Sequence, residues 1–172
     1  VMNKHIRRLV GTALFAAAIL VGTMVLGVPL PSGGYGNFGD VFVITAAFFL
    51  GPVWGFAAAG LGSALADILL GFALYAPATF IIKGCMAVLF ACLCRSVRPR
   101  AWFAMSAFLA EAVMVGGYFL FESFLYGPGA ALANVPGNMA QGVLGLVLSS
   151  VIVITASASK PIMRYAAAWK KG

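Results

Sequence analysis

The chain has 172 residues, of which 63% are hydrophobic and only 9% are charged, and its formal net charge is +7. In a soluble globular domain about a quarter of the residues are charged, so this composition excludes a soluble fold and indicates an integral membrane protein. At roughly 20 residues per membrane-spanning helix, the length allows six helices in one domain over residues 1–172 and leaves no room for a soluble domain.

The first predicted helix covers residues 9–28 and follows a short basic segment. Its apolar run is about 20 residues long and no small-residue cleavage site closes it, so we expect a retained helix rather than a signal peptide. Ala13 and Ala17 lie four positions apart on one face of this helix. Small residues let helices approach closely in lipid, so this face either packs within the chain or docks another membrane subunit.

The second predicted helix, residues 41–50, is short and follows a Pro- and Gly-rich loop. Asp40 stands where an N-cap belongs, so capping is one interpretation of this carboxylate. Ten helical residues rise only about 15 Å, half the thickness of the hydrocarbon core. Either the preceding loop therefore dips into the protein, where its backbone would need partners, or the helix continues through Gly51 and Pro52.

The third and fourth predicted helices, residues 53–72 and 78–94, carry charges inside apolar runs. Asp67 falls in the last turns of the third helix, and Lys83 lies about six residues into the fourth. Charges are costly in a membrane and call for an explanation. Two interpretations stay open: the two residues pair with each other and join the helices, or they contact a ligand.

The fifth predicted helix, residues 101–126, places Glu111, Tyr118 and Glu122 on one face. Glu111 lies near mid-depth, where a neutral structural role is an alternative. A second polar loop then leads to a sixth helix that we expect to start near Pro136. The first turns of that helix carry Asn138 and Gln141.

The distribution of charge predicts the topology. With the N-terminus in the cytoplasm, six spans place ten of the eleven basic residues at cytoplasmic ends, and the three outer connections contain none. This satisfies the positive-inside rule and puts both termini in the cytoplasm. The net charge is therefore an orientation signal, and no basic stripe with interleaved aromatic residues indicates nucleic-acid binding.

Several classes of function lack their sequence signatures. There is no P-loop motif, no G-x-S-x-G elbow, and the only histidine is His5 in the basic segment. The three cysteines, Cys85, Cys92 and Cys94, have neither zinc-site spacing nor histidine partners, and we interpret them as buried structural thiols. No metal site, cofactor or catalytic residue is expected, and the chain is not expected to be an enzyme.

With the predicted topology, polar residues from the outer loops and from the second to sixth helices gather in the outer half of the protein. Scattered structural residues would not sort to one side in this way, so we predict a pocket open to the outside. The predicted substrate-binding residues are Tyr35, Asn37, Asp40, Tyr75, Thr79, Lys83, Tyr118, Glu122, Asn138 and Gln141.

Three spaced motifs carry a family resemblance: G-Y-G-N-F-G-D at 34–40, F-F-L-G-P-x-x-G at 48–55, and D-I-L-x-G-F-x-x-Y-A-P-A-T-F-I-I-K-G at 67–84. Together they resemble the substrate-binding S components of energy-coupling factor (ECF) vitamin transporters. The resemblance implies an all-α fold of six membrane helices that binds one vitamin-sized ligand near the outer surface, capped by the outer loops. It also implies a membrane T component and two cytoplasmic ATPases as partners. The family's A-x-x-x-A docking motif is matched by Ala13 and Ala17, which favours the docking interpretation.

The third motif resembles the subgroup for small pyrimidine- or pyridine-type vitamins. Asp40 and Glu122 beside tyrosines would suit a small aromatic ring with a protonated nitrogen. We therefore expect a vitamin B6 vitamer, pyridoxamine rather than pyridoxine, with hydroxymethylpyrimidine, thiamine, riboflavin and a queuosine precursor as alternatives. Two other classes stay open: a stand-alone membrane facilitator or channel, and a structural membrane protein without a ligand.

Overall fold

The computed structural model describes residues 3–25, 27–30, 35–94 and 100–164. The element order is α1 (Lys4–Val25), β1 (Val28–Pro29), β2 (Tyr35–Gly36), α2 (Gly39–Leu50), α3 (Pro52–Leu69), α4 (Ala76–Leu93), α5 (Arg100–Tyr126) and α6 (Pro128–Ala158). A further helical stretch covers residues 160–164. The fold is thus helical as predicted, apart from a two-stranded antiparallel hairpin, β1–β2, in the first loop.

Five of the helices are long and apolar enough to cross a membrane, by length and composition: α1, α3, α4, α5 and α6. The remaining helix, α2, has only 12 residues. Its shortness agrees with the sequence expectation. The alternative in which it continues through Gly51 is wrong, because α2 ends at Leu50.

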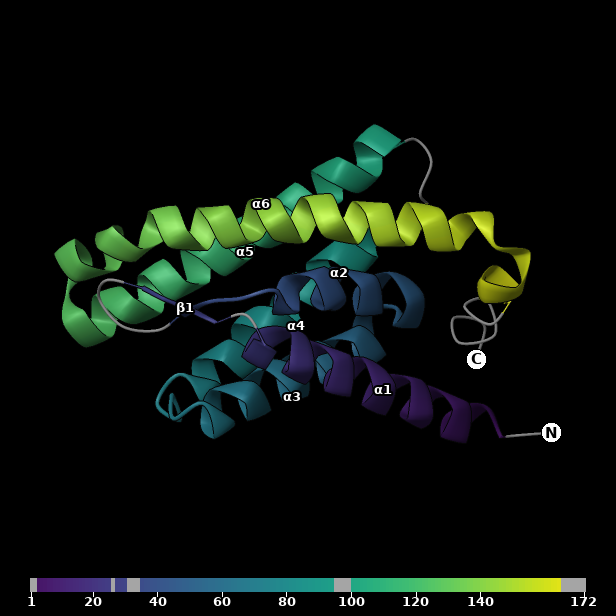
Figure 1. Ribbon diagram of the computed structural model, residues 1–172, viewed down its shortest axis with the longest axis horizontal. Coiled ribbons are helices and arrows are strands. Elements are labelled where there is room, and N and C mark those ends of the chain that lie inside the picture. Colours follow the sequence, from purple (N-terminus) through teal and green to yellow (C-terminus); the bar gives the residue numbers. More distant parts are fainter. Residues whose placement is uncertain (1–2, 26, 31–34, 95–99, 165–172) are drawn as a thin grey trace.

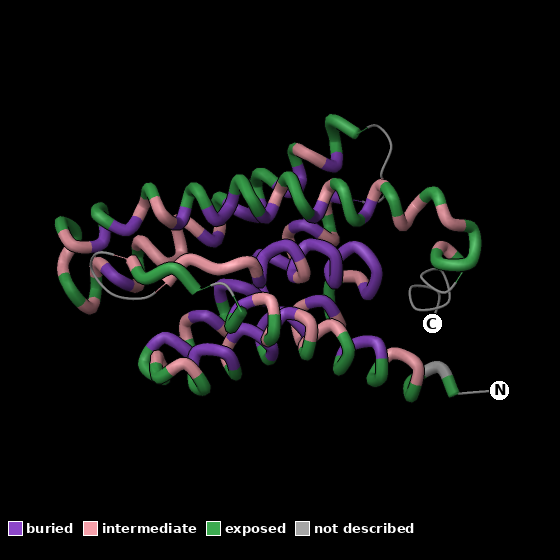
Figure 2. Tube along the Cα trace, viewed as in Figure 1, coloured by how far each residue is buried: buried purple, intermediate pink, exposed green. Residues whose placement is uncertain are grey.

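The short helix α2 forms the centre of the molecule. Eleven of its twelve residues are buried, and it packs against α1, α3, α4 and α6. Figure 2 shows it as an almost continuous buried segment between the longer helices, whose outer faces are exposed. An apolar helix without a polar face is expected in such a position.

A tight connection follows α2. Gly51 has φ of +80°, a conformation that L side chains rarely adopt, and Pro52 begins α3 directly after it. Glycine permits the left-handed backbone and proline fits the first turn of a helix, so the two residues reverse the chain at minimal length.

Small residues allow α3 to pack closely against its neighbours. A Cβ added to Gly62 would stand 2.6 Å from the backbone oxygen of Ala16 in α1. On the other side, α3 and α4 interlock through Phe56 and Phe80, whose rings meet edge to face at 5.4 Å and cover glycines of the opposite helix. Close backbone approach of this kind drives helix association in lipid, where the hydrophobic effect between helices is absent.

The connections separate into two ends of the bundle (Figure 1). The hairpin β1–β2 lies at the same end as the α3–α4 and α5–α6 turns, whereas α1 begins and α6 ends at the opposite end. The polar residues of the first loop and of these two turns are thereby brought to a common end of the molecule.

Three sequence expectations are corrected by the fold. The sixth helix does not start near Pro136: α6 begins at Pro128 and includes Pro136 in its interior, so the expected second polar loop is absent. Asp40 is not an N-cap, because α2 begins one residue earlier and its cap carries no side-chain hydrogen bond. Of the three cysteines only Cys94 is buried, while Cys85 and Cys92 are exposed on the outer face of α4.

Candidate functional site

A small polar cavity lies between the first loop, the α3–α4 turn and the helices α5 and α6. Its volume is about 20 Å³, room for about one water molecule. The lining residues are Leu30, Tyr35, Asn37, Asp67, Tyr75, Thr79, Tyr118, Glu122 and Asn138. We refer to this space as the polar cavity.

Tyr35 joins the first loop to α3. Its hydroxyl donates a hydrogen bond of 2.6 Å to Asp67 Oδ1, and its ring lies 4.9 Å from that of Phe72. Burial raises the pKa of the Tyr35 phenol, and the hydrogen bond to Asp67 raises it further. The phenol therefore stays protonated at neutral pH and keeps the loop tied to α3.

The α4 and α5 side of the polar cavity is held by two contacts. Thr79 and Tyr118 share a hydrogen bond of 3.0 Å, and the Tyr75 hydroxyl lies 3.5 Å from Glu122 Oε1. The α3–α4 turn positions Tyr75 immediately before α4, one helical turn ahead of Thr79. Two helices thus present hydroxyl groups to one space.

Two carboxylates of the polar cavity keep a free oxygen. No described residue is hydrogen-bonded to Asp67 Oδ2 or to Glu122 Oε2, and both side chains are almost fully buried. A buried carboxylate oxygen without a partner costs free energy, and a ligand with hydrogen-bond donors would supply the missing partner.

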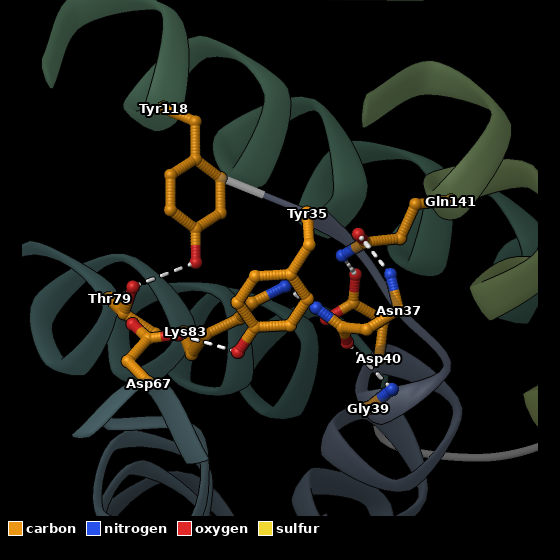
Figure 3. Close-up of polar contacts among 9 residues, drawn as sticks. All are labelled: Tyr35, Asn37, Gly39, Asp40, Asp67, Thr79, Lys83, Tyr118 and Gln141. Carbon is orange, nitrogen blue, oxygen red and sulfur yellow. Dashed lines mark hydrogen bonds and ion pairs between the residues drawn. The ribbon is translucent and has the colours of Figure 1, made fainter. Parts of the chain in front are cut away.

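A second polar network lies beside the cavity (Figure 3). Lys83 forms an ion pair with Asp40, and the Gln141 amide donates to the other oxygen of Asp40. Gln141 Oε1 in turn accepts a hydrogen bond of 2.8 Å from the backbone N–H of Asn37. The buried ion pair therefore orients Gln141, which holds the first loop against α6.

The structure separates the predicted substrate-binding residues into two groups. Seven line the polar cavity: Tyr35, Asn37, Tyr75, Thr79, Tyr118, Glu122 and Asn138. Asp40, Lys83 and Gln141 do not line it and are bonded to one another instead. Of the two interpretations of Asp67 and Lys83, the mutual pair is wrong, because Lys83 pairs with Asp40 and Asp67 accepts from Tyr35.

The predicted set omitted two residues of the cavity. Asp67 was left open between a structural pair with Lys83 and a ligand contact, and its position inside an apolar run was the signal that indicated function. Leu30 carried no signal, since an apolar residue in a loop looks like any other.

Glu111 lies outside the polar cavity. It is buried against Gly145 of α6, and neither of its oxygens has a hydrogen-bond partner in the described part of the chain.

The face of α1 that carries the small residues points outward. Ala13 and Ala17 are exposed, whereas Ala16 and Ile19 on the neighbouring face pack against Gly62 of α3. The two alanines of the motif are therefore not used for packing within the described chain.

Comparisons with known proteins identify the family. The family model "ECF-type riboflavin transporter, S component" matches residues 3–158. A thiamine precursor transporter, HmpT, of Lactococcus lactis subsp. cremoris (strain MG1363) is 33% identical over 153 residues, which cover 87% of each chain. A protein of Pyrococcus woesei described as an uncharacterized protein in the gap 3' region is 36% identical over 132 residues, 76% of this chain and 88% of that one.

The fold also matches a solved structure. The S component of a bacterial ECF transporter superposes with a TM-score of 0.73 at 20% sequence identity, covering 90% of this chain and 97% of that one. The chain therefore belongs to the ECF-type riboflavin transporter S component family, and it is a multi-pass protein of the cell membrane.

Proposed function

We propose that the chain is the substrate-binding component for a small pyrimidine-type thiamine precursor, with hydroxymethylpyrimidine as the leading candidate. The observation that carries this proposal is the pair of buried carboxylates, Asp67 and Glu122, each with an unbonded oxygen at one cavity.

The chemistry of an aminopyrimidine fits this pair. A protonated ring nitrogen and the adjacent exocyclic amine form two parallel N–H donors, which a carboxylate accepts in a charge-assisted, bidentate geometry. A hydroxymethyl group on the same ring adds a third donor for the second carboxylate. The tyrosine rings at 35, 75 and 118 supply faces for stacking the ring.

The thiamine precursor transporter that resembles this chain supports the same class of ligand. A vitamin B6 vitamer, the ligand favoured from the sequence, is the second candidate, because a pyridine ring with a protonated amine also offers donors to two carboxylates. Riboflavin, thiamine and a queuosine precursor stay as further alternatives, because the described space of about 20 Å³ is smaller than any of these compounds and does not rank them by size.

The proposal extends to topology and partners. We expect six spans with both termini in the cytoplasm, which places the polar cavity near the outer surface. As an S component, the chain would work with a membrane T component and two cytoplasmic ATPases. The exposed Ala13 and Ala17 of α1 are our candidates for the surface that meets the T component.

The test is a thermal-shift titration of the purified protein in detergent with hydroxymethylpyrimidine, pyridoxamine, pyridoxine, thiamine and riboflavin. A ligand present at 100 times its dissociation constant stabilises the native state by about 2.7 kcal/mol, which gives a readable shift. Stabilisation by hydroxymethylpyrimidine at the lowest concentration is the expected result. Preferential stabilisation by pyridoxamine would replace the pyrimidine with B6, and no shift with any compound would contradict both.

A further inference from the structure

Tyr35 makes two contacts with the segment 67–72 at the end of α3. Its hydroxyl donates to Asp67 Oδ1 at 2.6 Å, and its ring lies 4.9 Å from the ring of Phe72. Phe72 is itself tied to Asp67, because its backbone N–H donates a 2.7 Å bond to the backbone oxygen of Asp67. The backbone of Tyr35 pairs with Pro29 in the hairpin β1–β2. Ring, backbone and hydroxyl are thus all held, and the hydroxyl reaches Asp67 from a defined position (Figure 3).

The hydrogen bond makes the two oxygens of Asp67 unlike each other. Oδ1 accepts from Tyr35, whereas Oδ2 has no hydrogen-bond partner among the described residues, and the side chain lines the polar cavity. The terminal torsion of an aspartate is broad, so a neighbouring donor decides which way the carboxylate turns. Tyr35 supplies that donor, and its phenol stays protonated because burial raises its pKa.

The other two tyrosines of the polar cavity make different contacts. Tyr118 shares its hydrogen bond with Thr79, and the Tyr75 hydroxyl lies 3.5 Å from Glu122, longer than an ordinary hydrogen bond between two oxygens. Tyr35 is therefore the tyrosine of this cavity with the best geometry for orienting a carboxylate.

We infer that Tyr35 is a positioning residue: its hydroxyl binds one oxygen of Asp67 and thereby presents the other oxygen, as an acceptor, to a hydrogen-bond donor of the ligand. This inference rests on the proposed function, since it assumes a ring with N–H or O–H groups at the polar cavity. It also narrows the ligand class. The group that meets Asp67 must donate, as an amine, a protonated ring nitrogen or a hydroxyl does, and a carboxylate or phosphate at that place is excluded.

The first test is Tyr35→Phe, which keeps the ring beside Phe72 and removes the donor. Asp67 is then free to turn, so the dissociation constant for hydroxymethylpyrimidine should rise by about tenfold, the effect of one hydrogen bond. Ser106→Ala is the control. It removes a buried hydroxyl that donates 2.8 Å to the backbone oxygen of Trp102 and that does not line the polar cavity, so the dissociation constant should stay unchanged. Melting temperatures without ligand verify that each variant is folded.

The second test repeats Tyr35→Phe in the Asp67→Asn protein, because a weaker affinity alone would also follow from a loosened first loop. A phenol donates more strongly than it accepts, so Tyr35 should draw the amide oxygen of Asp67→Asn toward itself and leave the amide NH₂ against the donor of the ligand. Without the hydroxyl, the amide can turn its oxygen to the ligand. Tyr35→Phe should therefore lower the dissociation constant in the Asp67→Asn protein, although it raises that of the unaltered one.

The outcomes separate this inference from the proposed function. Opposite effects of Tyr35→Phe in the two proteins are the expected result. If the unaltered protein binds hydroxymethylpyrimidine or another single-ring vitamin, but Tyr35→Phe fails to tighten binding in the Asp67→Asn protein, the positioning role is overturned and the proposed function stands. An unchanged affinity of Tyr35→Phe alone also overturns only the positioning role. If the unaltered protein binds none of the compounds, the proposed function and the positioning role fall together.

Discussion

The four carboxyl residues of the chain lie in three different environments. Asp40 is paired with Lys83, Glu111 has no partner among the described residues, and Asp67 and Glu122 each keep one oxygen unbonded beside the polar cavity. Their roles therefore differ although their chemistry is the same, and each environment predicts a different result of substitution.

Removing the charge of a cavity carboxylate should weaken ligand binding. Asp67→Asn keeps an oxygen that can accept from Tyr35 while it loses the charge, and Glu122→Gln makes the equivalent change. Each should weaken hydroxymethylpyrimidine by roughly 1.5–3 kcal/mol, the value of a hydrogen bond to a charged group, measured by titration calorimetry.

Glu111→Gln is the matched control for these two substitutions, because it removes a buried carboxyl that does not line the polar cavity. The affinity of Glu111→Gln for hydroxymethylpyrimidine should equal that of the unaltered protein. If Asp67→Asn and Glu122→Gln also bind this ligand with unchanged affinity, the two cavity carboxylates are structural.

Breaking the buried ion pair should cost stability rather than affinity alone. Lys83→Met leaves Asp40, whose side chain is 0% exposed, without its counter-charge. We expect the free energy of unfolding to fall by about 3–5 kcal/mol, and denaturant titration in detergent measures this change. Lys160→Met, an exposed lysine near the end of the described chain, should have no such effect. A Lys83→Met protein as stable as the original would show that Asp40 finds another partner.

The sequence predicted the neighbourhood of these residues but not their pairing. Apolar surroundings and the charge pattern predict that Asp40, Asp67 and Lys83 lie in the outer half of one membrane domain, and the structure brings all three to one polar region. Which carboxylate meets Lys83 depends on how α2 lies relative to α4, and α2 is apolar on every side, so no polar stripe in its sequence indicates its rotation. Tertiary packing alone decides the pair.

At the scale of elements, close helix packing predicts strong position dependence for glycine substitutions. The methyl group of Gly62→Ala would overlap the backbone of α1 at Ala16. A helix backbone cannot move aside as easily as the end of a flexible side chain. The expected cost is about 1–3 kcal/mol, seen as a lower melting temperature in detergent.

Gly116→Ala in α5 is the control for this substitution. An added Cβ meets nothing within 4 Å there, and alanine favours a helix over glycine by about 1 kcal/mol. It should therefore be neutral or stabilising. A Gly62→Ala protein that behaves in the same way would contradict the close contact of α1 with α3.

The sequence predicts helix boundaries well where an apolar run ends at a glycine, a proline or a tyrosine. Gly51 and Pro52 predicted the break between α2 and α3 as one alternative, and Tyr75 and Pro77 marked the start of α4 within three residues. The start of α6 was missed, because Pro136 inside a stretch of small residues resembles a helix start. In a membrane helix, proline is tolerated in the interior when neighbouring groups satisfy the freed backbone. The hairpin β1–β2, two residues per strand, is too short to leave a periodic pattern.

For the whole molecule, the exposed small-residue face of α1 predicts a separation of binding from transport. Ala13→Trp should leave ligand affinity unchanged, since α1 does not line the polar cavity, and should abolish uptake into vesicles that contain the T component and the ATPases. Met105→Trp on the exposed side of α5 tests whether any bulky lipid-facing residue has this effect, and its uptake should be normal. Normal uptake by Ala13→Trp would remove the docking assignment.

The same vesicles distinguish the other class of transporter. Uptake by this chain alone, without T component and ATPases, would identify a stand-alone facilitator. We expect ligand binding without net uptake under those conditions, because a proposed S component depends on the T component and the ATPases for transport.

The burial of α2 has a consequence for the surrounding bilayer. A helix of 12 residues is about 18 Å long and one of 31 residues about 46 Å, so α2 is too short and α6 too long for a hydrocarbon core of about 30 Å. Lipid acyl chains meet only α6 and the other long helices, since α2 is enclosed on all sides. Hydrophobic mismatch therefore acts on the over-long α6, and tilting relieves it. Because Gln141 of α6 is hydrogen-bonded to Asp40 of α2, we expect α6 to tilt together with the whole bundle, which leaves the buried ion pair intact.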